Sequence, residues 1–114
     1  GVSCSFTIEP VLAEYLLDDE QATTMFRIAQ ESLTNVARHA DATRVDIRAW
    51  IEGNVICLTI QDDGKGIEAR HLLDLESPGL LGMHERARRI GADLRISGEA
   101  GRGTQVSLHL PSPR

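Results

Sequence analysis

The chain has 114 residues, of which 41% are hydrophobic and 25% are charged, a composition typical of one soluble globular domain. Its formal net charge is −5, from 12 basic and 17 acidic residues, and no basic run argues for a nucleic-acid-binding surface. No apolar stretch has the length of a membrane span, and no signal-length segment opens the chain. We therefore expect residues 1–114 to form one cytoplasmic domain without direct membrane contact, even if the parent protein is membrane-anchored.

The two cysteines, Cys4 and Cys57, both alternate with apolar neighbours. This pattern predicts two buried thiols in strands. A disulfide framework is improbable with two cysteines, and no Cys-x-x-Cys or Cys/His cluster indicates a metal site.

The first predicted elements are a strand and a long helix. Apolar and polar residues alternate through residues 2–8, which is the period of a strand, and Pro10 ends it. Acidic residues 18–20 suit a helix N-terminus. From about residue 20 to residue 40, apolar side chains recur at the spacing of an amphipathic helix, at Ala22, Met25, Phe26, Ala29, Leu33, Val36 and Ala37.

The remaining chain predicts four more strands and a second helix. Strands at residues 45–51 and 55–60 flank a hairpin turn at Gly53. Residues 67–79 include Pro78 and are weakly periodic, which predicts a loop with a short helix near residues 72–73. A helix follows at residues 81–90, capped by Gly91. Strands near residues 94–96 and 106–110 flank a glycine-rich turn at 98–103. Together these elements predict an α+β fold, with helices on one face of a mainly antiparallel sheet.

One side of the first helix carries a polar stripe whose spacing is i, i+4, i+7 and i+8, made of Glu31, Asn35, Arg38 and His39. Such a stripe is ordinarily a solvated face. Here a carboxylate and an amide stand one turn apart, followed by two potential phosphate partners. Mg²⁺ takes oxygen ligands and keeps several waters when it bridges phosphates. The same helix face could therefore hold the metal and contact a phosphate chain.

Three glycine-containing motifs follow, and each has an ordinary structural interpretation as well. Residues 62–66 read D-D-G-K-G after a strand. The structural interpretation is a tight turn. The functional one is an aspartate that faces a pocket, with glycines that let the backbone pass close to a flat ligand. Residues 79–82 read G-L-L-G before a helix. This motif fits either a flexible helix start or a phosphate-binding site at the helix N-terminus. Residues 101–104 read G-R-G-T before the last strand, where a hairpin turn is a sufficient explanation.

In this order the four motifs are specific, and the sequence resembles the catalytic domains of sensor histidine kinases, in the superfamily shared with gyrase B, Hsp90 and MutL. Residues 30–40 look like the N box of that family, residues 62–66 like its G1 box, 79–82 like its G2 box and 101–104 like its G3 box. The likeness covers nearly the whole chain. Glu31, the segment at 79–87 and a short loop without phenylalanine are similar to the subfamily of nitrate sensors and the lipid-fluidity sensor.

The resemblance implies a two-layer α/β sandwich, the Bergerat fold, with ATP held between helices and a mobile lid. Asp62 would accept the adenine amino hydrogen, Asn35 would bind Mg²⁺, and Glu31 would be the catalytic residue that orients or deprotonates the nucleophile. The other implied nucleotide-binding residues are Arg38 and His39 near the phosphates, Gly64 and Gly66 at the adenine, Thr104 at the purine edge, and Gly79, Leu81, Gly82 and Met83 at the lid and the helix after it.

The implied activity is transfer of the ATP γ-phosphate to a histidine on an upstream dimerisation domain that is not among these 114 residues. A response regulator would then receive the phosphoryl group. The implied cofactors are ATP and Mg²⁺, and we expect the isolated domain to be monomeric. None of its four histidines, His39, His71, His84 and His109, is flanked by the helical pattern expected of an acceptor.

Other functions stay open on the sequence. An ATP-driven clamp of the gyrase or Hsp90 kind is disfavoured by the short lid and by the end of the chain soon after the last strand. A sensing module that binds ATP without transfer is disfavoured because both Glu31 and Asn35 are present. A serine kinase that binds a sigma factor is disfavoured by the segment at 79–87. No Walker A pattern is present, which excludes a P-loop site.

Overall fold

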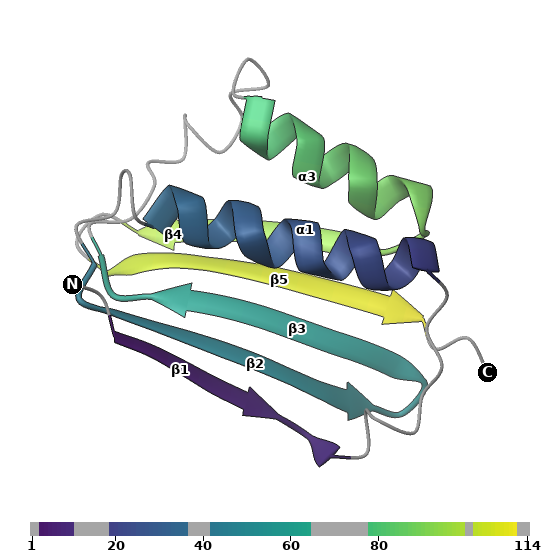
Figure 1. The fold of residues 1–114 in the computed structure, drawn as a ribbon, viewed down its shortest axis with the longest axis horizontal. Coiled ribbons are helices and arrows are strands. Elements are labelled where there is room, and N and C mark those ends of the chain that lie inside the picture. The colour runs from purple at the N-terminus through teal and green to yellow at the C-terminus, as the bar shows by residue number, and fades with distance from the viewer. Residues whose placement is uncertain (1–2, 11–18, 37–41, 65–77, 100–101, 112–114) are drawn as a thin grey trace.

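The computed structural model describes residues 3–10, 19–36, 42–64, 78–99 and 102–111 (Figure 1). These residues form five strands and two long helices, in the order β1 (Ser3–Ile8), α1 (Asp19–Asn35), β2 (Arg44–Glu52), β3 (Val55–Asp62), α3 (Pro78–Arg89), β4 (Asp93–Glu99) and β5 (Gly103–Pro111). No helix in these ranges is long and apolar enough to cross a membrane.

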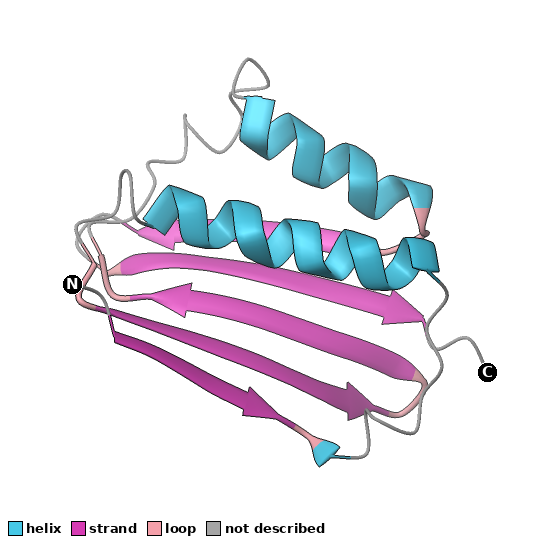
Figure 2. Ribbon diagram, viewed as in Figure 1, coloured by secondary structure: helices cyan, strands magenta, loops and turns pink. Residues whose placement is uncertain are grey.

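The strands form one mixed sheet in the order β1-β2-β3-β5-β4. β1 runs parallel to β2, and the other neighbouring pairs are antiparallel. Figure 2 shows both helices on the same face of this sheet, which gives two layers. The predicted α+β sandwich with a mainly antiparallel sheet is therefore confirmed.

The core lies between the sheet and the helices, and the two-residue period of the strands builds it. Register pairs Leu58 with Leu108 and Ile60 with Val106 across β3 and β5, and all four side chains are buried. Polar residues such as Thr59 and Ser107 occupy the alternate positions and point to the other face. Burial of the apolar face is what fixes this register, because a slip of one residue would expose it.

The two helices are joined to this core and to each other. Ile28 of α1 is 0% exposed and Met83 of α3 is 1% exposed, and both belong to the same hydrophobic cluster as the strand residues. The Ser32 hydroxyl donates to the Ile28 carbonyl at 2.7 Å and lies 3.8 Å from the Met83 sulfur. α1 and α3 therefore contact each other through Ser32 and Met83.

The start of α3 differs from the prediction. The helix begins at Pro78 rather than near residue 81, so the residues predicted to precede it lie inside its first turns. Proline is well suited to the first helical position, because its φ is fixed near the helical value and its missing N–H has no partner there. The predicted cap is confirmed at the other end. Gly91 has a φ of 70°, its N–H donates to the Arg88 carbonyl, and the Ala92 N–H donates to the Ala87 carbonyl, which is a Schellman motif.

β1 is an exposed edge strand. Phe6 is 63% exposed, although its register partner Ile47 in β2 is buried. Cys4 is exposed for the same reason, whereas Cys57 in the central strand β3 is buried. The expectation of two buried thiols is thus right for Cys57 and wrong for Cys4, because alternation in the sequence does not distinguish an edge strand from a central one.

Candidate nucleotide-binding site

The segments that carry the four motifs converge toward one side of the molecule. α1 ends at Asn35, β3 ends at Asp62, α3 begins at Pro78 and β5 begins at Gly103 (Figure 1). Because β3 and β5 are antiparallel neighbours, the end of one lies beside the start of the other. The fold therefore gathers motifs that are far apart in the sequence.

Asp62 is the best-defined member of this site. It is only 4% exposed, and it lies on the helix-covered face opposite the fully buried Val45. Its Oδ1 accepts hydrogen bonds from the backbone N–H of Gly64 at 2.8 Å and of Thr104 at 3.3 Å. A carboxylate has about four acceptor positions, so two such bonds fix its orientation and leave capacity for a ligand donor. The predicted Asp62, Gly64 and Thr104 are thus brought together by the structure.

Gly103 belongs to the same arrangement, although the sequence-based site did not include it. Its φ is 90°, a conformation that favours glycine. A Cβ at this position would overlap the Asp62 carbonyl oxygen and lie 2.8 Å from the carbonyl carbon and 3.2 Å from Oδ1. Gly103 is the second glycine of the G-x-G-T motif, so the sequence marks its position. Only the structure shows that the missing side chain makes room for Asp62.

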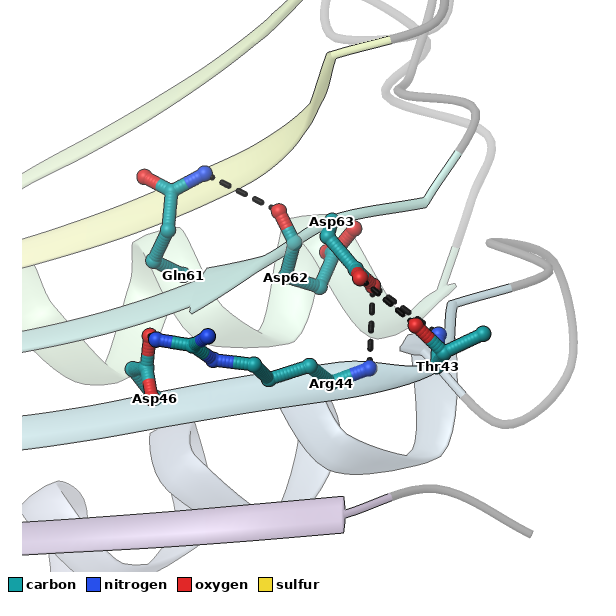
Figure 3. Close-up of polar contacts among 6 residues, drawn as sticks. All are labelled: Thr43, Arg44, Asp46, Gln61, Asp62 and Asp63. Carbon is teal, nitrogen blue, oxygen red and sulfur yellow. Dashed lines mark hydrogen bonds and ion pairs between the residues drawn. The ribbon is translucent and has the colours of Figure 1, made fainter.

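The next residue, Asp63, points away from Asp62 and toward β2 (Figure 3). Its Oδ1 accepts from the backbone N–H groups of Thr43 and Arg44, each at 2.9 Å, and its Oδ2 accepts from the Thr43 hydroxyl at 2.7 Å. The hydrogen bond from the Thr43 hydroxyl, followed by those from the Arg44 and Thr43 backbones, lowers the pKa of Asp63. The Asp63 side chain is therefore a charged link between the two strands at neutral pH.

Two N-box residues lie in the last turns of α1. Glu31 is half-buried, and Asn35 is the last residue of α1, four positions further along the chain. This pair of carboxylate and amide suits Mg²⁺, which uses one or two carboxylates together with phosphates and waters. No group of three or more His, Cys, Asp and Glu side chains that could hold a metal occurs among the described residues. Arg38 and His39 lie outside those residues.

The G2 residues lie in the first turns of α3. Leu81 is partly exposed. The Met83 side chain is buried in the core, so only the Met83 backbone could contact a ligand. A Cβ on Gly82 would meet the far end of the Arg86 side chain, at 2.9 Å. Gly79 also lies within the helix. Gly66 of the G1 box and residues 67–77 of the predicted loop lie outside the described residues.

Comparison with known sequences decides the family. Residues 20–114 match the family of histidine kinase-, DNA gyrase B- and HSP90-like ATPases. The chain belongs to this family. The match includes all four motifs, so the assignment inferred from their order is confirmed.

Two bacterial signalling proteins illustrate the likeness of this ATPase domain to known relatives. The signal transduction histidine-protein kinase/phosphatase UhpB of Salmonella typhimurium is 38% identical over 98 residues, which are 86% of this chain and 19% of UhpB. The sensor protein VraS of Staphylococcus haemolyticus is 37% identical over 90 residues, which are 79% of this chain and 26% of VraS. The ATPase domain thus spans only a small part of each relative.

A solved structure gives the corresponding likeness in fold. The histidine kinase domain of the blue-light activated histidine kinase EL346 from Erythrobacter litoralis superposes with a TM-score of 0.77. The match covers 97% of this chain and 52% of that chain, at 22% sequence identity. The ATPase domain therefore has the fold of a histidine kinase catalytic domain.

Proposed function

We propose that this ATPase domain is the ATP-binding catalytic domain of a sensor histidine kinase. It binds ATP with Mg²⁺ and transfers the γ-phosphate to a histidine on a dimerisation domain of the same protein, from which a response regulator receives it. The observation that carries this proposal is the buried Asp62 carboxylate, oriented by two backbone N–H groups, within a chain of this ATPase family. The likeness to UhpB, a histidine-protein kinase/phosphatase, and to the sensor protein VraS favours kinase chemistry over an ATP-driven clamp.

The adenine half of the site follows from the chemistry of Asp62. A buried carboxylate only accepts hydrogen bonds, so it selects the exocyclic amino group of adenine and repels the carbonyl oxygen that guanine presents at the same position. Gly64 and Gly66 allow the backbone to approach the base, and the buried Thr104 lies beside the Asp62 carboxylate at the purine edge. The site is therefore specific for an adenine nucleotide.

The phosphate half rests on the N and G2 boxes. Asn35 would hold Mg²⁺, which when bound bridges phosphate oxygens and offsets the charge that develops during transfer. Glu31, one turn earlier, would orient the attacking imidazole or accept its proton. Arg38 and His39 would contact the phosphates, together with Gly79, Leu81, Gly82 and the backbone of Met83 at the start of α3.

The same proposal places the domain in the cytoplasm as a monomer when it is isolated. Its partners are the upstream histidine-bearing domain and the response regulator. Its net charge of −5 supports neither a nucleic-acid partner nor adhesion to an anionic membrane surface.

Asp62→Asn tests the adenine contact. The amide loses the charge and presents an NH₂ group as well as an oxygen, so we expect ATP affinity to fall by about 10- to 100-fold, the value of a hydrogen bond to a charged group. Calorimetric titration with ATP measures this effect, and thermal unfolding of the same sample checks that the variant is folded. Wild-type ATP affinity in a folded Asp62→Asn domain would remove Asp62 from the site.

A labelling experiment tests where the acceptor histidine lies. His84 is within α3, and His109 lies in β5 between the buried Leu108 and Leu110, on the sheet face away from the helices. A histidine fixed in this way cannot reach the in-line position that phosphoryl transfer requires. We therefore expect the isolated domain to bind ATP and form no stable phosphohistidine.

The measurement is incubation with γ-labelled ATP, alone and with the dimeric helical domain of the parent protein, followed by acid treatment of the labelled bands. Acid-labile label should appear only on the added domain. His39 and His71 lie outside the described residues, and of these two His71 belongs to the predicted loop. Acid-labile label on the isolated domain that His71→Ala abolishes would show that the acceptor is internal.

A further inference from the structure

The hydrogen-bonded ladder between β2 and β3 ends in an unusual way next to the site. Val45 and Asp62 are the last paired residues of the two strands, and one more backbone bond follows, from the Asp63 N–H to the Arg44 carbonyl at 3.2 Å. In a continuing antiparallel pair the Arg44 N–H would donate back to the Asp63 carbonyl. Here it donates to the Asp63 carboxylate at 2.9 Å instead. The side chain supplies the acceptor that the backbone would supply if the strand went on.

Because the Asp63 carboxylate replaces a backbone acceptor, β3 can stop pairing with β2 directly after Asp62. Asp62 and Asp63 point to opposite sides of the strand, and Figure 3 shows Asp63 held by Thr43 and Arg44. Asp62 is held from the β5 side by the Thr104 N–H, and Asp63 is held from the β2 side by Thr43 and Arg44. The position of the Asp62 carboxylate is thus fixed between two strands.

We propose that Asp63 is a positioning residue of the nucleotide site, whose carboxylate anchors the end of β3 to β2 so that Asp62 faces the adenine amino group. This inference rests on the proposed function and adds a residue that does not itself touch the ligand. The three bonds to Asp63 all come from Thr43 and Arg44, and the Thr43 carbonyl in turn accepts from the Ser3 N–H at 2.9 Å. The anchor therefore connects three strands, β1, β2 and β3, at the edge where the site lies.

The test compares two nucleotides in the purified domain, ATP and purine riboside triphosphate, which lacks the exocyclic amino group. In wild type, ATP should bind roughly tenfold or more tightly than the analogue, because only ATP donates to Asp62. Asp63→Ala should weaken ATP binding by roughly tenfold and change the affinity for the analogue by less than about twofold. A variant that merely lowers the folded fraction would weaken both nucleotides by the same factor, so the ratio of the two affinities isolates positioning.

Three further variants complete the experiment. Asp63→Asn should restore most of the selectivity, since its amide oxygen can still accept from both backbone N–H groups. Asp46→Ala is the matched control, because Asp46 bonds the Arg44 guanidinium at 3.3 Å and not the backbone of Thr43 or Arg44, and it should leave the ratio unchanged. If Asp63→Ala does not fold, Thr43→Val removes the single 2.7 Å hydroxyl bond and should lower the ratio by a smaller factor.

An unchanged ratio in Asp63→Ala, or in Thr43→Val where the former does not fold, overturns the positioning role. So does a parallel loss of affinity for both nucleotides. Wild-type protein that binds ATP no better than the analogue would contradict the adenine contact of the proposed function, and this inference with it. That failure is recognised from the wild type alone, before any variant is measured.

Discussion

Gly103→Ala is expected to remove most ATP binding, although the substitution adds a single methyl group that touches no ligand. The methyl carbon would overlap the carbonyl oxygen of Asp62 and stand 3.2 Å from its Oδ1, so the end of β3 must move. The Asp62 carbonyl cannot shift freely, because the Gln61 side chain donates to it at 3.0 Å. Moving the Asp62 carboxylate removes its hydrogen bond to adenine, so we expect ATP affinity to fall by about 10- to 100-fold, as in Asp62→Asn.

Stability should fall in the same variant. A non-glycine residue at a φ of 90° is strained by about 1–3 kcal/mol, and overpacking adds a similar amount, so the free energy of unfolding should decrease by about 2–6 kcal/mol. Denaturant unfolding and ATP titration, each on the same preparation, measure the two effects separately.

Gly53→Ala is the matched control. Gly53 also has a positive φ, of 63°, but no atom of the described residues lies within 4 Å of a Cβ at that position, which is in the turn between β2 and β3. This variant should be destabilised by about 1–2 kcal/mol through backbone strain and should bind ATP normally when folded. Equal ATP affinity of folded Gly103→Ala and Gly53→Ala would show that Gly103 does not hold Asp62 in place.

The contrast between these glycines indicates what the sequence could and could not predict. The two-residue alternation predicts β1, β2 and β5, and the helical spacing of apolar residues predicts α1, because burial of one face leaves a local trace in the sequence. Turn and cap glycines mark the other described strands and α3. The N, G1, G2 and G3 motifs were found for a similar reason, since each is a short run of adjacent residues. The order of the motifs, rather than any one of them, predicted the family.

Contacts between distant segments left no such trace. Asp62 and Thr104 are 42 residues apart, and Thr43 and Asp63 are 20 residues apart. A turn is a sufficient explanation for Gly103, and a second turn aspartate is a sufficient explanation for Asp63, until the strands are seen side by side. The predicted start of α3 is wrong for a local reason. Proline both ends helices and begins them, so the sequence around Pro78 fits a loop residue as well as the first residue of α3.

Glu31→Gln should separate nucleotide binding from phosphoryl transfer. Glutamine keeps the size and an oxygen acceptor but loses the negative charge and the ability to take a proton, so a residue that acts on the nucleophile is disabled while the pocket keeps its shape. Glu31 stands one turn before Asn35 on α1 and is half-buried. We expect ATP affinity within about threefold of wild type, and a transfer rate lowered by about 10²- to 10⁴-fold, the range of general acid–base catalysis.

The rate is measured in a single turnover, with saturating ATP and Mg²⁺ and the histidine-bearing domain of the parent protein as acceptor. Glu20→Gln provides the same chemical change at the other end of α1, where Glu20 forms an exposed ion pair with Arg89 at 3.9 Å that contributes at most about 1 kcal/mol. It should transfer phosphate at the wild-type rate. If Glu31→Gln also does so, Glu31 has no role at the nucleophile. If instead ATP affinity and rate fall together and the loss of affinity disappears without Mg²⁺, Glu31 acts at the metal beside Asn35.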